Sequence, residues 1–553
     1  MKKILLIVLC AVALQLHAQE QLPKWLSDLQ TLNPGLIDSI LYYAATPKAP
    51  DTRTYVIYYN QPLKHSQSGS AHFPLRALIT VYKNADPTTA VNHVYASGYS
   101  LMGDFLAYPD SCFAAGNNCV TEIAHRYNAN FIQIEHRYFQ QSAPQNCWTN
   151  LDDLRAEEAA ADFHNLFEGL KKVLKGKFVM SGVSKGGITT LLQHRFYPND
   201  MDIYVPYSAP FFNTDRDTTM QQYWYTNGWN KEYLDMFMNI RRSGIYRRDN
   251  IFPAFLKMRG PADTKAAQDS VYWYYLSEIA GFGYQEHAYG DTASIRYQMY
   301  RNDSIMEAKH VQAYGDTVYA FMFDKSTFNL DQFPQWLDTL RKYPEPNQAP
   351  RFQRRQKHIR PFGITYNQWW GNDSVDGAAY VYQAKRELGY FDYRFDLIIE
   401  DAAQAAEYNN YWKQQTGCLI DLESPFFRNL SFSAELYDAT MTATQNATKP
   451  IVLIYGLDDA WTGGAVKDQF VNGTNVKKFI LPAQNHMAFF SSNTDKAMCD
   501  AIRAMLDAAL APSQDLDDPI VHRPSPTRKF LRDGHLLIER DGRIYNVQGV
   551  EVK

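Results

Sequence analysis

The stretch that decides the fold is Lys177–Pro198, which reads KFVMSGVSKGGITTLLQHRFYP. Its first part is apolar and of strand type, and a helix-like run with Leu191 and Leu192 follows directly. Between the two lies Gly182–Gly186, which matches the pattern G-x-S-x-G. This pattern can hold a nucleophilic serine on a strained strand-to-helix turn, where only small neighbours let strand and helix pass closely. We therefore predict a nucleophile at Ser184, with a serine in an ordinary glycine-rich loop as the alternative.

Strand-type runs recur on both sides of this stretch. They cover residues 55–63, 77–83, 130–138, 177–184, 202–209, 450–456 and 476–481. Several are apolar without alternation, as in strands that are covered on both faces. Helical patterns lie between them, and after Asn150 the apolar positions from Phe163 to Leu174 fall on one helical face. Alternating strands and helices predict an α/β fold with a mostly parallel sheet.

The chain has 553 residues, enough for more than one compact unit. We expect two parts of one sheet domain over residues 19–210 and 431–511, with a helical cap inserted between them over 211–430. The insertion is rich in Tyr, Trp, Arg and Gln and reads as mostly helical. From residue 512 a proline-rich linker leads to short apolar runs with two Asp-Gly pairs, which predict a small β module of hairpins at 512–553.

Residues 1–18 are typical of a secretory signal peptide. A basic start precedes a short apolar run, and a cleavage site follows at Ala18. The run is too short to span a bilayer, and no later segment is apolar and long enough to do so. We predict a secreted protein without a membrane span, located outside the cell, at the cell surface or in the periplasm.

Composition and cysteine usage exclude several classes of function. The formal net charge of −4 gives no basic footprint for nucleic acid. The sequence has no CxxC pair and no histidine cluster at metal-ligand spacing, so we predict no metal and no cofactor. Cys112 and Cys119 are close enough along the chain for a small loop disulfide, and the pairing of the other cysteines stays open.

A nucleophilic serine needs a base and an acid that orients the base. In an α/β architecture with the G-x-S-x-G turn they follow in the order Ser, Asp, His. Downstream of Ser184, one apolar strand ends at Asp458 and Asp459, and the next is followed by His486. Both positions lie just past the carboxyl end of a strand, where open α/β sheets build their sites. We predict His486 as the base and Asp459 as the acid, with Asp458 as the rival.

An ordered set of motifs extends this pattern: IEHRYFQQSAP, SGVSKGG, YQAKRELGY, GLDDAW and a late histidine. The set resembles the secreted serine peptidases that include prolyl tripeptidyl aminopeptidases, with lysosomal prolyl carboxypeptidase and dipeptidyl peptidases as relatives. The resemblance implies an α/β-hydrolase fold with an inserted helical cap and a triad of Ser184, Asp459 and His486. In that family the acid belongs to a D-P-W element, which maps onto Asp459-Ala460-Trp461 with alanine in place of proline.

Two backbone donors are expected to form an oxyanion hole. One is the N–H of Lys185, directly after the serine, and the other is the N–H of Tyr138 at the end of the strand 130–138. The charged side chains of Glu135 and Arg137 at that strand end are better explained as buried salt-bridged groups.

The resemblance also assigns substrate contacts. Trp461 is expected to contact the substrate beside the acid. In the cap, Glu387 is expected to bind the free amine of a peptide, because a carboxylate in a partly dry cleft is a good ammonium partner. The alternative for Glu387 is a helix-surface carboxylate paired with an arginine, Arg386 or Arg137.

These expectations combine into a secreted serine exopeptidase that releases short N-terminal peptides through an acyl-enzyme, with proline selectivity implied by the resemblance. The alternatives are an esterase or lipase with the same triad, and a non-catalytic peptide- or glycan-binding protein that uses the aromatic cap. The tail after residue 512 resembles the C-terminal modules of enzymes exported by type IX secretion, so an export machinery is the expected partner besides peptide substrates.

Overall fold

A computed structural model of the chain describes residues 22–43, 51–101, 119–144, 151–227, 231–259, 264–284, 379–414, 430–491, 493–511, 528–532, 535–540 and 543–546. The predicted signal peptide and the predicted cysteine partner Cys112 lie outside these residues. The chain separates into two compact units, Met1–Leu510 and Ala511–Lys553. Among the described helices, none has the length and apolar character needed to cross a bilayer.

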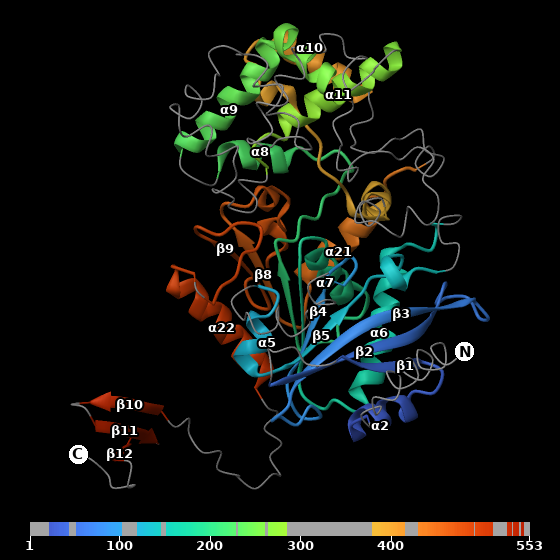
Figure 1. Cartoon of the computed structure of the whole chain (residues 1–553), viewed down its shortest axis with the longest axis vertical. Coiled ribbons are helices and arrows are strands. Elements are labelled where there is room, and N and C mark those ends of the chain that lie inside the picture. The colour runs from blue at the N-terminus through green and yellow to red at the C-terminus, as the bar shows by residue number, and fades with distance from the viewer. Residues whose placement is uncertain are drawn as a thin grey trace, which may run out of the picture. The chain divides into compact units, whose positions relative to one another are not determined.

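The first unit is built on a nine-stranded sheet (Figure 1). Its order is β1-β2-β3-β5-β4-β6-β7-β8-β9. The strands are β1 (Ile37–Tyr43), β2 (Thr52–Pro62), β3 (His72–Tyr82), β4 (Asn92–Ala96), β5 (Asn130–Ile134), β6 (Phe178–Val183), β7 (Ile203–Tyr207), β8 (Ile451–Gly456) and β9 (Val476–Leu481).

The pairing divides this sheet into two parts. Strands β1, β2 and β3 pair antiparallel, and β3 pairs antiparallel with β5. From β5 across to β9 every pair is parallel. Strands β4 to β8 are buried along their whole length, which explains their continuous apolar runs. The architecture is the α/β-hydrolase fold that the sequence predicted.

Two strands were not predicted from the sequence, β1 and β4. Strand β4 begins with Asn92 and His93, which read as polar loop residues. Both are buried, because Asn92 accepts a hydrogen bond from the Asn130 amide at 2.8 Å and a His93 ring nitrogen lies 2.7 Å from the Ser181 hydroxyl. A parallel strand can carry such polar residues where neighbouring strands supply partners.

Helices cover both faces of the sheet. On one face pack α2 (Lys24–Leu32), α6 (Ala156–Lys171), α7 (Lys185–Phe196) and α21 (Glu435–Gln445). On the other face pack α5 (Glu122–Tyr127) and α22 (Lys496–Leu510). The result is a three-layer sandwich in which the carboxyl ends of β4 and β6 to β9 meet along one edge.

A helical group with its own aromatic core lies within the predicted cap range (Figure 1). Its described elements are α8 (Thr219–Thr226), α9 (Lys231–Tyr246), α10 (Arg248–Arg259), α11 (Lys265–Ala280) and α20 (Ala402–Gln414). The short helix η4 (Ala384–Leu388) lies in the same sequence range but packs against α21, and its Leu388 belongs to the sheet core. The aromatic core includes Trp224, Phe255, Tyr275 and Trp412. The tyrosines and tryptophans that distinguish this part of the sequence therefore hold the cap together.

The second unit contains a three-stranded antiparallel sheet of β10 (Arg528–Arg532), β11 (His535–Arg540) and β12 (Arg543–Asn546). The register pairs Arg532 with His535 and Arg540 with Arg543. The residues between these pairs are the two Asp-Gly dipeptides, so each predicted hairpin is present.

Candidate active site

Ser184 occupies a strained turn between β6 and α7. Its φ of 61° and ψ of −123° lie outside the regions that ordinary residues prefer. The glycines around it are required by close packing, because a Cβ at Gly182 would come within 2.5 Å of the Ala96 carbonyl oxygen and one at Gly186 within 2.1 Å of it. The half-buried Ser184 therefore lies on the elbow that the pentad predicted.

Asp459 and His486 form a buried pair. The Asp459 side chain has 0% exposure, and its Oδ2 lies 2.8 Å from Nδ1 of His486. The other carboxylate oxygen accepts the Trp461 backbone N–H at 3.0 Å. The carboxylate is thus fixed on both sides, and it fixes the imidazole in turn.

Gly456 lets the two loops come together. It ends β8, and a Cβ there would lie 2.4 Å from the backbone oxygens of Gln484 and Asn485. The rival acid Asp458 is half-buried, and its backbone N–H donates to the Gln484 carbonyl at 2.8 Å. This backbone bond sets the register of the acid loop, and the next residue, Asp459, is the one that reaches the imidazole.

The serine lies at the same sheet edge as this pair. Ser184 follows β6, Asp459 follows β8 and His486 follows β9, and these strands run parallel with β7 between β6 and β8. Backbone hydrogen bonds join the ends, since the Ser184 N–H donates to the Tyr207 carbonyl at 3.0 Å and the Ser208 N–H donates to the Ile454 carbonyl at 2.7 Å. The three predicted catalytic residues thus lie at neighbouring carboxyl ends of one parallel sheet, with the acid and base in direct contact.

The predicted oxyanion donor at Tyr138 needs correction. Its N–H donates to the Ser142 carbonyl at 2.9 Å and is already used inside the protein. The neighbouring side chains are salt-bridged as expected, with Glu135 2.6 Å from Arg76 and Arg137 2.6 Å from Asp162. The strand end 135–138 is therefore a buried structural corner.

The loop after β4 lies against the nucleophile turn instead. Gly98 in this loop has a φ of +77°, and a Cβ on it would lie 2.7 Å from the Gly186 nitrogen. This is the position from which an α/β hydrolase supplies its second oxyanion donor. The sequence reasoning missed it because the strand that leads into the loop, β4, was itself missed. The other predicted donor, the N–H of Lys185, belongs to the first residue of α7, where backbone N–H groups have no partner within the helix.

Trp461 joins the acid loop to the cap. Its ring centroid lies 6.3 Å from that of His486 and 5.2 Å from that of Phe391, and its indole N–H donates to the Tyr284 hydroxyl. An aromatic wall therefore stands next to the base. No sequence motif distinguishes Phe391 or Tyr284 from the many other aromatic residues of the insertion.

Tyr223 of α8 is a second contact between cap and acid loop. Its hydroxyl donates to the Leu457 carbonyl at 3.0 Å. Burial, followed by the negative charges of Asp459 and Asp458, raises the pKa of Tyr223 to about 12. The hydroxyl thus stays protonated beside the acid loop. No sequence motif distinguished this tyrosine from its many neighbours.

Glu387 lies deeper than an exposed cleft residue would. Only 7% of the residue is exposed, and its Oε1 accepts the Ala156 backbone N–H at the start of α6 at 2.7 Å. Burial raises the pKa of this carboxyl, while the charges of Arg155, Arg386 and Lys185 oppose the shift. Arg137 is not the ion-pair partner of Glu387, because its guanidinium binds Asp162. Amine binding by Glu387 stays a prediction, and the carboxylate already has partners inside the protein.

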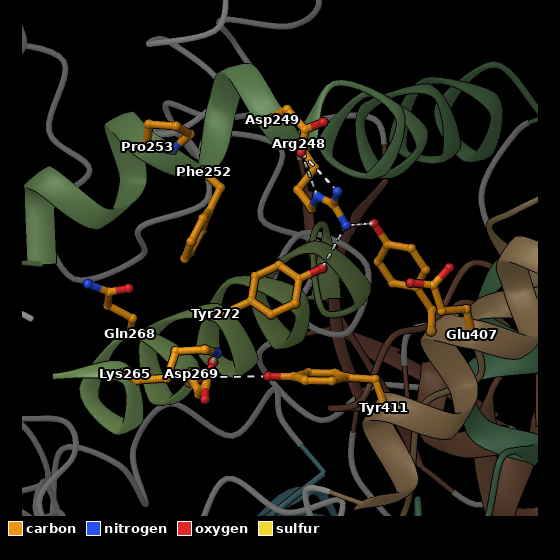
Figure 2. A pocket seen from close by; sticks show the side chains of 11 residues that line it. Arg248, Asp249, Phe252, Pro253, Lys265, Gln268, Asp269, Tyr272, Glu407 and Tyr411 are labelled. Atoms are coloured by element: carbon orange, nitrogen blue, oxygen red, sulfur yellow. Dashed lines mark hydrogen bonds and ion pairs between the residues drawn. The ribbon is translucent and has the colours of Figure 1, made fainter.

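A cavity of about 440 Å³ lies within the helical cap (Figure 2). Phe252, Tyr272 and Tyr411 line it, together with charged residues. Its polar groups bind one another, since the Arg248 guanidinium donates to the Tyr272 hydroxyl at 3.4 Å, as Figure 2 shows. The same guanidinium donates to the Tyr408 hydroxyl at 3.3 Å. None of the predicted site residues lines this cavity.

Two further expectations concern metals and cysteines. Within the described residues, His164, Glu168 and Asp200 form the one cluster with metal-ligand spacing. The Lys171 ammonium lies 3.2 Å from Glu168 and 3.7 Å from Asp200, so this group is an ion-pair network. Cys119 is buried with a free thiol, and its predicted partner Cys112 lies outside the described residues, so the loop disulfide stays a prediction.

Parts of the chain are similar to known proteins. Residues 44–258 match the family model described as PS-10 peptidase S37. This part of the chain, less than half of its length, is thus similar to S37 peptidases. A prolyl tri/tetrapeptidyl aminopeptidase of Streptomyces mobaraensis is 27% identical over 282 residues, which are 50% of this chain and 52% of that protein. The chain thus aligns with about half the length of this relative.

Solved structures that match this chain include a proline iminopeptidase of Mycobacterium smegmatis. It is 13% identical, with a TM-score of 0.30, and 86% of this chain and 99% of that chain are covered. The esterase LipA of Xanthomonas oryzae is 10% identical, with a TM-score of 0.32 and coverage of 86% and 100%. A peroxisomal α/β-hydrolase of Saccharomyces cerevisiae is 10% identical, with a TM-score of 0.31 and coverage of 89% and 93%.

Proposed function

We propose that this chain is a serine peptidase in which Ser184 is the nucleophile, His486 the general base and Asp459 the orienting acid. The observation that carries the proposal is the combination of a strained Ser184 turn with a buried Asp459–His486 pair at the same sheet edge. A strained serine costs free energy that an ordinary loop would avoid, so it is expected where the strain serves catalysis.

The pair defines the direction of proton transfer. Because Nδ1 of His486 faces Asp459, Nε2 is the nitrogen left to take the Ser184 proton. Attack of the serine oxygen on the scissile carbonyl then gives a tetrahedral oxyanion, which the Lys185 N–H and an N–H of the loop 97–100 would stabilise. The imidazolium returns the proton to the leaving amine, an acyl-enzyme remains, and water releases it by the same route in reverse.

The finer proposal is an exopeptidase that removes short peptides from a free N-terminus, with preference for proline at the cleaved bond. It is supported by the printed name of the Streptomyces relative, prolyl tri/tetrapeptidyl aminopeptidase. The aromatic wall of Trp461, Phe391 and Tyr284 beside His486 also suits an apolar ring.

Two experiments test the proposal. A fluorophosphonate probe should label the wild-type protein and leave Ser184→Ala unlabelled, whereas a non-catalytic binding protein would not be labelled at all. A library of peptides and activated esters, read by mass spectrometry, should then give di-, tri- or tetrapeptide products from free N-termini. Turnover of long-chain esters without turnover of any peptide would make the chain an esterase.

We also propose that the protein is exported and that the tail from residue 512 directs it to the export machinery. The basic and apolar start of the sequence and the separate second unit support this. Fractionation of the native host, with a full-length chain and one ending at Ala511, should show the full-length protein outside the cytoplasm. Equal distribution of the two chains would remove the role assigned to the tail.

A further inference from the structure

The side chain of Lys185, the residue after the nucleophile, turns back into the protein. The residue is only 1% exposed, and its ammonium donates to the carbonyl of Gly98. The rings of Phe139 and Tyr99 lie 5.1 Å and 5.5 Å from Nζ. Gly98 belongs to the loop that follows β4 and contacts the nucleophile turn. One side chain thus bonds the loop 97–100 to Lys185, the residue whose backbone N–H is the proposed oxyanion donor.

A buried ammonium is an expensive way to make one hydrogen bond. Burial lowers the pKa of Lys185 to about 7, and the carboxylate of Glu387 opposes this shift. The imidazole of His136 adjoins the same small cavity as Lys185 and Gln383, and burial lowers its pKa well below the usual value, so it supplies no second charge. An apolar residue of similar length would fill the space without this cost, so the contact with Gly98 requires a reason.

The two proposed oxyanion donors come from different elements, and this explains why a buried lysine side chain would contact Gly98. The N–H of Lys185 moves with α7, whereas the loop 97–100 moves with the end of β4. A displacement of about 1 Å between two catalytic elements can cost roughly a hundredfold in rate. A bond from the Lys185 side chain to the Gly98 carbonyl holds the loop at a fixed distance from the Lys185 backbone.

We propose that Lys185 is a positioning residue, whose side-chain bond to the Gly98 carbonyl holds the loop 97–100 against the nucleophile turn so that both elements face one oxyanion. Glu387 supplies the counter-charge that makes the buried ammonium tolerable, and its second partner, the Ala156 N–H, anchors that charge to the start of α6. The proposal rests on the serine-hydrolase function above and is independent of the substrate's amine.

The test compares three variants on an activated acetate ester, which has no amine and therefore does not involve amine binding by Glu387. Lys185→Met removes the bond to Gly98 and keeps the backbone N–H at position 185. Lys185→Met/Glu387→Gln removes the bond and also the counter-charge, which leaves a neutral pair of similar volume. Glu387→Gln alone gives the effect of the carboxylate and keeps the bond. Thermal melting checks that each variant is folded.

Lys185→Met should lower kcat about a hundredfold with little change in KM, and the double variant should stay equally slow although its melting temperature recovers. Affinity for a boronic acid, which forms a tetrahedral adduct with Ser184, should fall by the same factor as kcat/KM. Loss of less than threefold in kcat, unchanged boronate affinity, or recovery of activity in the double variant would overturn the proposal. Unfolding of both Lys185 variants would make Lys185 a structural residue and would also overturn it.

A failure of the proposed function gives a different result. In that case the wild-type protein would not react with the fluorophosphonate or the ester, before any Lys185 variant is made. A wild-type enzyme that is active through Ser184, together with fully active Lys185→Met, would reject the positioning role alone.

Discussion

Oδ2 of Asp459 lies 2.8 Å from Nδ1 of His486 across 27 residues of chain. The contact exists because β8 and β9 are parallel neighbours, and the loop after each strand begins at the same sheet edge. Its chemical result is one tautomer of the imidazole, with the proton on Nδ1 and a lone pair on Nε2.

Asp459→Asn should therefore lower kcat by about 10⁴, because the amide favours the wrong tautomer while it keeps the shape of the side chain. Asp458→Asn is the matched control one residue earlier, and it should retain most of the activity. Steady-state kinetics on one peptide substrate measures both. Equal losses, or a larger loss at Asp458, would transfer the role of the acid to Asp458.

Gly186→Ala should unfold the nucleophile turn locally and abolish labelling of Ser184. The new Cβ would lie 2.1 Å from the Ala96 carbonyl oxygen, and backbone cannot move aside cheaply. Gly169→Ala is the control, since its Cβ would meet the end of the movable Leu36 side chain at 2.8 Å. Melting temperature and fluorophosphonate labelling should both fall for the first variant and change little for the second. Full labelling of Gly186→Ala would show that the turn tolerates a side chain.

Glu122 should make the stability of the first unit depend on pH. Burial raises the pKa of this carboxyl to about 7 from its usual 4.5. The folded state thus holds the proton more tightly than the unfolded state, so the extra stability is fully present below about pH 4.5 and is lost as the pH rises through about 7. The full span corresponds to about 3 kcal/mol.

Glu122→Gln tests this dependence. The carboxylate accepts the Tyr207 hydroxyl at 2.7 Å and the Ser491 N–H at 2.9 Å, and glutamine keeps one acceptor without a titrating charge. The melting temperature of the wild type relative to this variant should fall between pH 5 and pH 8. A difference that stays constant over this range would show that Glu122 does not titrate there.

A chain ending at Ala511 should keep peptidase activity. The division into Met1–Leu510 and Ala511–Lys553 leaves every predicted site residue in the first unit. Activity and melting temperature of the shortened chain should match those of the full chain within about twofold and a few degrees. Insoluble or inactive shortened protein would show that the tail supports the catalytic unit.

The substrate's amine is the remaining prediction. If the enzyme recognises a free N-terminus, acetylation of a peptide should lower kcat/KM about tenfold to a hundredfold, because one charge-assisted contact worth roughly 1.5–3 kcal/mol is lost. Glu387 is buried and bonded to Ala156, so we expect Glu387→Gln to lower the rates on free and acetylated peptides by the same factor. A loss confined to free peptides would instead establish Glu387 as the amine anchor that the sequence predicted.

The sequence predicted most strands of the sheet from their apolar character, although it missed β1, and it predicted site residues where they directly followed such a strand. Ser184, Asp459 and His486 meet both conditions, and the structure places them at neighbouring strand ends. Strand β4 failed the first condition, because Asn92 and His93 find polar partners that only the folded sheet supplies. Because β4 was not predicted, the second oxyanion donor was assigned to Tyr138 at the end of the predicted strand 130–138. In the structure the Tyr138 N–H donates to the Ser142 carbonyl instead.

The roles of residues that act through tertiary contacts could not be predicted from the sequence either. Tyr223 reaches Leu457 across 234 positions, and Lys185 reaches Gly98 across 87. Neither contact corresponds to a motif, a characteristic spacing or a periodic pattern in the sequence. The buried environment of Glu387 depends likewise on the start of α6, which lies 231 positions away.

The contact between α8 and the acid loop limits how the cap can open. The Tyr223 hydroxyl donates a hydrogen bond to the Leu457 carbonyl. Gly463 also packs closely against α8, because a Cβ on Gly463 would lie 2.4 Å from the Thr219 carbonyl oxygen. Helix α8 is therefore hydrogen-bonded to and closely packed against the segment that carries Asp459. Any movement of the cap that leaves Asp459 in place therefore has to occur in the part of the insertion beyond α8.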